Sequence, residues 1–235
     1  MNTTGLTAGS LDVPLSDMSV QISQPDLGQI IPRADAARYE ARFLLTVSNS
    51  DPLVVGRPES EAPVVAVALD GGRPRRVASA RAAITLGELI RADEQLADGE
   101  HWLFAAPFSA LGVPERAPGS PRSALARRFF VGNVGRTDAG ASGAVWLLSP
   151  EGTYNGGYAK NITIDAFAFD ALGRALTTRP TISLNGPLVA GEVRLTSPFG
   201  IGELTSGDYE VRASAPGAST VTTHFTINRE LSVGP

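Results

Sequence analysis

The sequence contains no cysteine, so its fold depends on packing and hydrogen bonds rather than on disulfides. Such a chain fits either a reducing cytoplasm or an exported bacterial protein whose domains are stabilised by their cores alone. No stretch approaches the ~18 consecutive apolar residues that a membrane-spanning helix needs, so we predict no transmembrane segment. Lysine is almost absent as well: Lys160 is the only one beside 19 arginines, which indicates a GC-rich bacterial genome.

Positive charge and histidine are also scarce. With a net charge of -4 and an isoelectric point near 5.3, the chain lacks the positive field that nucleic-acid binding requires, so we predict no nucleic-acid partner. The two histidines, His101 and His224, lie in different halves of the chain. A zinc or copper site needs roughly three or four clustered ligands, so we predict no metal site.

The motifs of common enzyme sites are missing too. The chain has no Gly-x-Ser-x-Gly elbow, no glycine-rich phosphate loop opening a helix and no Asp-x-Asp-x-Asp calcium loop. From these absences we predict a non-enzymatic protein with no catalytic residue and no cofactor.

The first 17 residues, MNTTGLTAGSLDVPLSD, lack the basic start and the apolar run of a signal peptide. They are typical of a flexible polar leader, such as remains when a lipoprotein or secreted protein is expressed without its signal. We therefore predict an exported protein, periplasmic or at the cell surface and possibly lipid-anchored. A natural cytoplasmic start is the alternative.

What the chain does contain is turn residues and a repeated phrase. Gly (25) and Pro (17) are abundant while charged residues make up only 19%, which favours short strands and many turns over long helices. LADGEHWLFA, from Leu96, and LTSGDYEVRA, from Leu204, share the pattern Leu-x-x-Gly-acid-aromatic-x-aliphatic-x-Ala. This phrase indicates an internal duplication.

Further matches occur in the same order along both halves. One pair shares an apolar-polar-Pro-acid-Gly entry, another alternates apolar and polar residues with the period of a half-buried strand, and Asp70-Gly71 and Asn185-Gly186 are dipeptides typical of tight hairpins. The pairs are VQISQPDLG with VWLLSPEG, ARFLLTVSNSD with KNITIDAFAFD, VAVALDGG with TISLNGP, ITL (84–86) with VRL (193–195), and RRFFVG with THFTIN. About seven short strands in each half predict an all-β fold of two tandem antiparallel Greek-key sandwiches.

The phrase from Leu204 to Val211 resembles the late-strand region of immunoglobulin-like and fibronectin-III-like domains, as found in tandem modules of bacterial secreted or lipid-anchored envelope proteins. In those families a tyrosine sits at a corner, and its hydroxyl bonds back to the backbone near the preceding turn. The resemblance gives Tyr209 this structural role. His101 stands in its place in the first half, which puts the bond there in doubt, and Trp102 is then expected to supply the packing.

The duplication sets the predicted boundaries. They are a leader over 1–17, an immunoglobulin-like module over 18–133 with long loop insertions, a linker over 134–143, a second immunoglobulin-like module over 144–230, and a tail over 231–235. Because the linker is short and rich in Gly, Ala and Ser, we expect the two modules to be loosely hinged neighbours.

Individual function is expected in the loops, where the two halves differ. The first module carries a long Pro-rich segment over 107–126, with Phe108, Leu111 and Arg116 as candidate partner contacts. The second carries SPEGTYNGGYAKN near Trp146, and its aromatic rings and amide could stack on a glycan or contact a protein. The candidate residues there are Trp146, Tyr154, Asn155 and Tyr158. A buried or turn-forming role is the alternative for each of them.

Two functions therefore remain open. The first is a structural or protein-interaction module of the bacterial cell envelope, with a protein partner there. The second is a module that binds a glycan or another small ligand through the second half. An accessory domain of a larger enzyme or surface assembly is a third alternative. The exposure of the aromatic rings distinguishes the first two, since a glycan site requires them on the surface.

Overall fold

The computed structural model describes residues 18–47, 64–72, 74–78, 83–90, 94–108, 124–132, 142–149, 152–155, 163–187, 193–195, 199–201 and 204–229. These residues are almost entirely β-strands, joined by turns and two helices of four residues each. Within these ranges no helix reaches the length and apolar character needed to span a bilayer.

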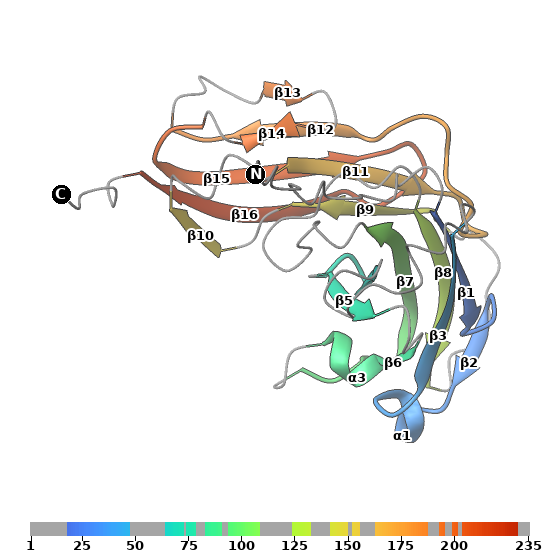
Figure 1. The fold of residues 1–235 in the computed structure, drawn as a ribbon. Helices are drawn as coiled ribbons and strands as arrows, with labels where there is room; N and C mark the ends of the chain where they lie inside the picture. Colours follow the sequence, from blue (N-terminus) through green and yellow to red (C-terminus); the bar gives the residue numbers. More distant parts are fainter. Residues whose placement is uncertain are drawn as a thin grey trace, which may run out of the picture.

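The first half of the chain forms a sandwich of two sheets (Figure 1). Its elements are β1 (Met18–Gln24), β2 (Gln29–Ile31), α1 (Arg33–Ala36), β3 (Glu40–Val47), β4 (Val64–Leu69), β5 (Arg75–Ala78), β6 (Ala83–Thr85), α3 (Leu86–Leu89), β7 (Gly99–Phe108) and β8 (Leu125–Val131). A three-stranded sheet has the order β1-β3-β6, and a five-stranded sheet has the order β2-β8-β7-β4-β5.

The second half repeats this topology strand for strand. Its elements are β9 (Ala144–Leu148), β10 (Gly152–Asn155), β11 (Thr163–Phe169), β12 (Thr181–Asn185), β13 (Val193–Leu195), β14 (Phe199–Gly200), β15 (Gly207–Ser214) and β16 (Val221–Asn228). The sheet orders are β14-β11-β9 and β10-β16-β15-β12-β13, which match those of the first sandwich when β9 is aligned with β1. The predicted fold class, two tandem immunoglobulin-like β-sandwiches, and the tandem repeat are therefore confirmed.

Each sandwich has eight strands rather than about seven, because its first strand is split between the two sheets. The Pro-acid-Gly motif is the place where the chain crosses over. Gly28 and Gly152 have positive φ angles of 70° and 87°. β2 follows Gly28 directly and β10 begins at Gly152, and these strands pair in parallel with β8 and β16. Positive φ is the conformation that glycine adopts at little cost. The sequence analysis matched this motif as the entry to each half, and the structure shows that the chain changes sheets there.

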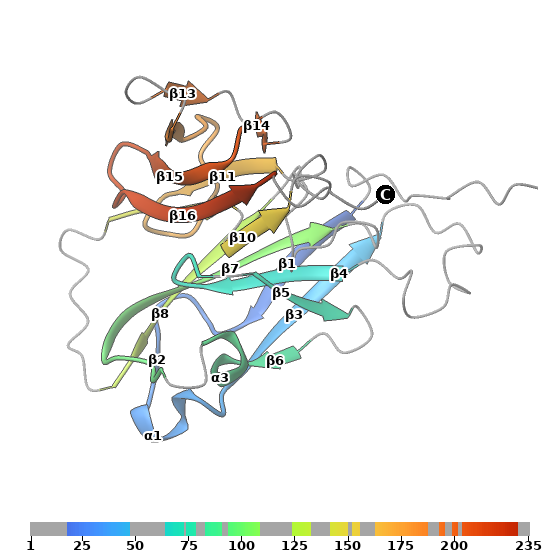
Figure 2. The same cartoon turned by 90° about the vertical axis from the view of Figure 1, so that its left-hand side faces the viewer.

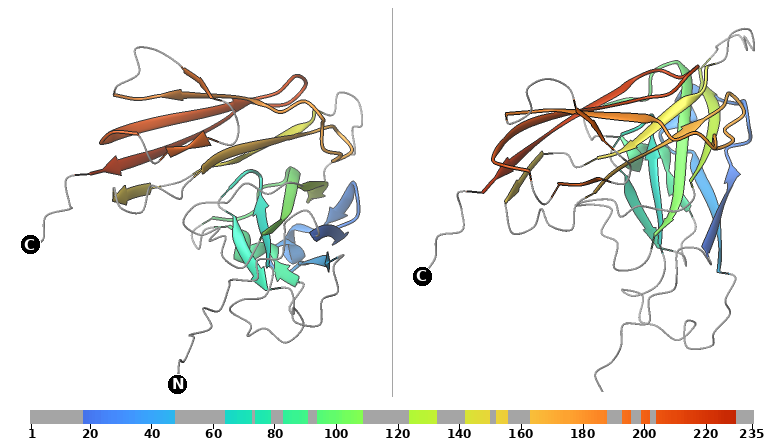
Figure 3. Two further views of the ribbon diagram at one scale, coloured as in Figure 1. Left: turned by 45° about the horizontal axis from the view of Figure 1, so that its top comes forward. Right: turned by 90° about the horizontal axis from the view of Figure 1, so that it is seen from above.

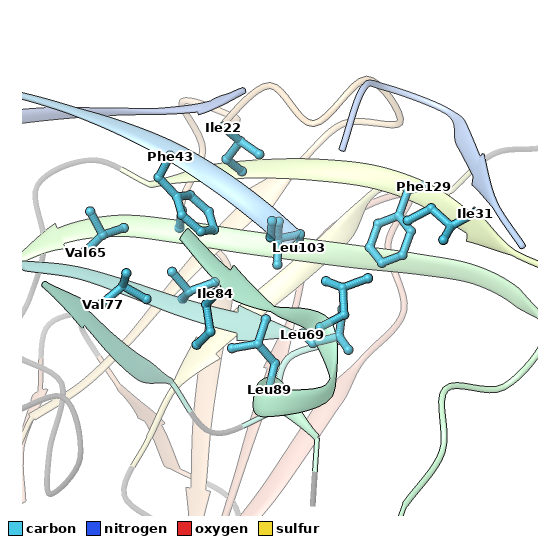
Figure 4. Packing of buried hydrophobic residues seen from close by; sticks show 14 of the residues in the cluster. Ile22, Ile31, Phe43, Val65, Leu69, Val77, Ile84, Leu89, Leu103 and Phe129 are labelled. Carbon is cyan, nitrogen blue, oxygen red and sulfur yellow. The ribbon is translucent and has the colours of Figure 1, made fainter. Parts of the chain in front are cut away.

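Each sandwich encloses its own hydrophobic core. Figure 4 shows the first, in which side chains from both sheets interdigitate, as the alternation of apolar residues predicts. Its labelled members are Ile22, Ile31, Phe43, Val65, Leu69, Val77, Ile84, Leu89, Leu103 and Phe129. The second core is built in the same way from residues of β9, β11, β12, β15 and β16, among them Val145, Ile164, Ile182, Tyr209, Val211, Phe225 and Ile227.

Two sequence matches were wrong in detail. ITL was paired with VRL, but residues 83–85 form β6 of the three-stranded sheet, whereas Val193–Leu195 is β13 of a five-stranded sheet. The counterpart of β6 is β14, and unequal loops had shifted the alignment. Asp70 and Gly71 do adopt the positive φ of a hairpin turn, at 52° and 76°, but neither Asn185 nor Gly186 does.

The expectation of loosely hinged modules is also wrong, because a third hydrophobic cluster joins the two sandwiches. We call it the inter-module cluster. The first sandwich contributes mainly small residues and two aromatic rings from the outer face of its five-stranded sheet: Ala66, Ala68, Trp102, Phe104, Ala106, Ala124 and Ala126. The second contributes Ala144 and four large residues from the outer face of its three-stranded sheet: Trp146, Leu148, Phe167 and Phe169.

The figures show how this contact is arranged. In Figures 1 and 3 the strands of the second sandwich lie across one end of the first, and β9 and β11 are the strands nearest to it. Figure 2 shows the same arrangement from the side. The alanines leave a flat surface on which the rings pack: Phe104 lies 5.5 Å from Trp146 and 5.6 Å from Phe169, centroid to centroid. These distances are within the range of favourable aromatic pairs.

Candidate functional site

The repeated phrase forms the same corner in both sandwiches. In the second, the Tyr209 hydroxyl donates a hydrogen bond of 3.0 Å to the carbonyl of Thr205, four residues upstream. The ring is buried and stacks on Phe225 of the neighbouring strand at 5.3 Å. This is the bond that the resemblance to immunoglobulin-like domains implies for Tyr209.

His101 makes the equivalent bond in the first sandwich, so Trp102 is not needed in its place. Its Nε2 lies 2.9 Å from the carbonyl oxygen of Ala97, again four residues upstream, and its ring stacks on Phe129 at 5.6 Å. Its Nδ1 lies 2.6 Å from a carboxylate oxygen of Asp70. Both ring nitrogens therefore face acceptors, an arrangement that only the doubly protonated imidazolium satisfies.

The surroundings of His101 also shift its pKa in favour of the imidazolium. Burial by itself lowers the pKa of the imidazole, but the hydrogen bond and the charge of Asp70, the Ala97 carbonyl and the charge of Glu100 outweigh it. The net result is a pKa raised above the ordinary value of 6.5. When folding raises the pKa of a group, protonation of that group stabilises the fold. This stabilisation is complete at pH values below the unfolded-state pKa and is lost as the pH rises through the folded-state pKa.

We therefore expect the thermal unfolding midpoint to fall as the pH rises above the ordinary imidazole value of 6.5 and through the raised pKa of His101, where the imidazolium loses a proton. The variant His101→Tyr, which copies the corner of the second sandwich, removes this titration and should flatten the dependence. Thermal melts of both proteins across this range measure the difference. An identical pH dependence in the two proteins would contradict the assignment.

The structure places Trp146, a predicted glycan contact, in the inter-module cluster with its side chain fully buried (0% exposed). The prediction that its ring is available for stacking is therefore wrong. Trp146 lies on β9, whose residues are all buried because one face contacts the second core and the other contacts the first sandwich. Its indole nitrogen has no hydrogen-bond partner, which is consistent with a purely packing role.

The other predicted contact residues do not gather into a site in the described part of the chain. Tyr154, on β10, is partly buried and packs against the second core, and Asn155 ends the same strand. Phe108 ends β7. Tyr158, Leu111 and Arg116 lie outside the described residues, so their roles as contacts stay predictions.

Polar side chains border the inter-module cluster. Asp165 on β11 is buried, and its carboxylate accepts a hydrogen bond of 2.9 Å from Arg179. The guanidinium of Arg179 lies 4.5 Å from the ring centroid of Phe167, at cation–π distance. On the first sandwich, Glu100 accepts a hydrogen bond of 2.9 Å from the indole of Trp102. These contacts fix the orientation of rings that belong to the cluster.

A hollow on the described surface of the second sandwich lies over β10, β16, β15 and β12. It is a groove of about 420 Å³. We call it the polar groove, because its outward side chains are Thr153, Asn185, Asp208, Glu210, His224 and Thr226. Gly152 and Gly186 also line it: a side chain at Gly152 would point into open space, whereas one at Gly186 would meet the buried ring of Tyr209.

Strand register aligns these side chains in two rows across the sheet. Asn185 pairs with Glu210, and Glu210 pairs with His224. Thr226 pairs with both Asp208 and Thr153. The sequence analysis did not identify this site: alternation along β15 and β16 could have placed the polar residues on one face, but the register between distant strands could not be derived from it.

The described residues include no group of three or more His, Asp or Glu side chains that could hold a metal ion. In the polar groove, the Nε2 of His224 lies 3.9 Å from Glu210 and the imidazole is 70% exposed. The groove can therefore form hydrogen bonds with a ligand, but it has no arranged nucleophile or general base with a third residue to orient it.

No family model matches the chain, and no curated protein matches it. Among solved structures, the chain is similar to the Ig1-2 module of the Drosophila receptor protein tyrosine phosphatase DLAR, with 13% identity over 89% of this chain and 98% of that one and a TM-score of 0.20. The chain is also similar to Drosophila N-cadherin EC1-4, with 12% identity over 91% of this chain and 51% of that one and a TM-score of 0.26. For Parabacteroides merdae β-glucuronidase the identity is 13% and the TM-score is 0.27. The match covers 89% of this chain and 24% of that one, so this chain spans about a quarter of that protein. These similarities carry no argument about function.

Proposed function

We propose that this chain is a non-enzymatic spacer and protein-interaction unit of a bacterial cell envelope, in which two immunoglobulin-like modules (18–133 and 144–230) act as one rigid body. The observation that carries the proposal is the inter-module cluster. A buried apolar contact between the two modules fixes the distance and the angle between their outer surfaces. A hinged pair would instead let those surfaces reorient freely.

The two modules use different faces for this contact. The first uses the outer face of its five-stranded sheet, and the second uses the outer face of its three-stranded sheet. The faces left over are mostly polar, with Gln21, Arg42 and Thr46 exposed around Leu44 on the first module and Asp208, Arg212 and His224 exposed on the second. In the described part of the chain neither face offers another copy a broad apolar surface like the inter-module cluster, so we propose that stacking stops at two modules.

A partner binds in this proposal through the Pro-rich segment over 107–126 of the first module. Phe108, Leu111 and Arg116 are the proposed contacts. The bacterial origin is supported by the arginine-rich composition, in which Lys160 is the only lysine, and the cysteine-free composition is compatible with the envelope. Glycan contact through Trp146 is not part of the proposal, because that side chain is buried.

The test is affinity capture from bacterial envelope extract with the intact chain and with a variant in which 109–123 is replaced by a short Gly-Ser turn. We expect one protein to be retained by the intact chain and lost by the variant, with both showing the same thermal unfolding midpoint. The matched control is Leu44→Ala, which trims an exposed residue of β3 and should leave capture unchanged. Equal capture by all three proteins, or capture of nothing, would contradict the proposal.

A further inference from the structure

We propose that the polar groove of the second module binds a neutral, hydroxyl-rich ligand of one or two sugar-ring size. This inference concerns a different surface from the protein-interaction function and does not rest on it. The groove volume, about 420 Å³, falls in the range of small-ligand sites. The groove also faces away from the first module, because the opposite sheet of the sandwich forms the inter-module cluster.

The groove side chains have the chemistry that hydroxyl groups need. The carboxylates of Asp208 and Glu210 accept hydrogen bonds, the amide of Asn185 both donates and accepts, and the hydroxyl of Thr153 does the same. Each sugar hydroxyl is both a donor and an acceptor, so a row of mixed groups matches a row of hydroxyls. Hydrogen bonds to the two carboxylates are the stronger ones, because the acceptor is charged.

The carboxylates are held in place before any ligand arrives. The Thr226 hydroxyl donates a hydrogen bond of 2.6 Å to Asp208, and Arg212 forms an ion pair of 2.8 Å with Glu210. Groups fixed in this way lose less conformational entropy when they bind a ligand.

Charge and the duplication together favour a neutral occupant. Arg212 compensates Glu210, so only Asp208 contributes an unbalanced negative charge, too little for a strongly basic ligand. The same face of the first module is apolar and binds the second module. There Trp102 and Phe104 occupy the positions that Glu210 and Arg212 occupy in β15. The equivalent face of the second module thus carries hydrogen-bonding groups where the first module carries the apolar groups of the inter-module cluster.

The experiment is calorimetric titration of the intact chain with four probes, the neutral disaccharides of glucose, galactose, mannose and N-acetylglucosamine. At least one should bind saturably. Asp208→Asn and Asn185→Ala should each weaken that binding about tenfold or more, which is the loss expected for one hydrogen bond. The loss should be larger for Asp208→Asn, because the hydrogen bond that it weakens has a charged acceptor. Glu40→Gln, which changes an exposed carboxylate on β3, is the matched control and should bind as the parent does.

Two results would overturn the inference. One is the absence of saturable binding by all four saccharides, or binding that Asp208→Asn and Asn185→Ala leave unchanged. The other is salt-sensitive binding of a tetra-arginine peptide that Asp208→Asn abolishes while no saccharide binds, which would identify the groove as a site for basic peptides. Equal thermal unfolding midpoints in all variants show that the fold is intact in each comparison.

Discussion

Replacing Trp146 with alanine is expected to split the unfolding of this protein into two transitions. The side chain is 0% exposed and packs on Phe104 of the other module, so its loss should cost about 3–5 kcal/mol of inter-module stability. Because Trp146 lies outside both module cores, each module should stay folded by itself. Differential scanning calorimetry distinguishes the parent's single transition from the variant's two.

Trp146→Phe is the matched control for this prediction. It keeps an aromatic ring against Phe104 and removes an indole nitrogen that has no hydrogen-bond partner. We expect a smaller loss of stability and a single transition. Two transitions already present in the parent protein, or one unshifted transition in Trp146→Ala, would show that the cluster does not couple the modules.

The second large effect is expected at the corner of the second module. Tyr209 is 2% exposed, stacks on Phe225 and hydrogen-bonds to Thr205, so Tyr209→Ala removes core packing and the corner bond together. The expected loss is about 3–5 kcal/mol of module stability. Denaturant titration, followed by circular dichroism, measures it.

Tyr209→Phe separates the hydroxyl from the ring. It keeps the stack on Phe225 and removes only the bond to Thr205, so the loss should be about 1 kcal/mol. If Tyr209→Phe proved as destabilising as Tyr209→Ala, the hydroxyl rather than ring packing would dominate. That result would contradict the packing account of the corner.

The sequence predicted the fold well because the relevant patterns are local. Alternation along Ala41–Val47, the positive φ at Asp70-Gly71 and the phrase around Tyr209 each depend on neighbouring residues. The eighth strand of each sandwich was missed because β2, β10 and β14 contain only two to four residues, too few to show a period.

The inter-module cluster was missed although the sequence contained a sign of it. VVAVAL of β4, AVWLL of β9 and AFAF of β11 are apolar on both faces of the strand, and such runs are typical of strands buried on both sides. The sequence analysis treated these runs as strands with one exposed face, and Trp146 was therefore predicted to be available for a glycan. The polar groove depends on the register of strands far apart in sequence, which no local pattern determines.

The central claim is that the two modules form one rigid body, and a distance measurement tests it most directly. The chain has no cysteine, so Thr46→Cys on β3 and Thr222→Cys on β16, both exposed, allow one spin label on each module. Double electron–electron resonance then gives the distribution of distances between the two labels. We predict a single narrow peak that broadens when Trp146→Ala is added. A broad distribution in the protein with Trp146 intact would contradict the claim and identify the modules as hinged.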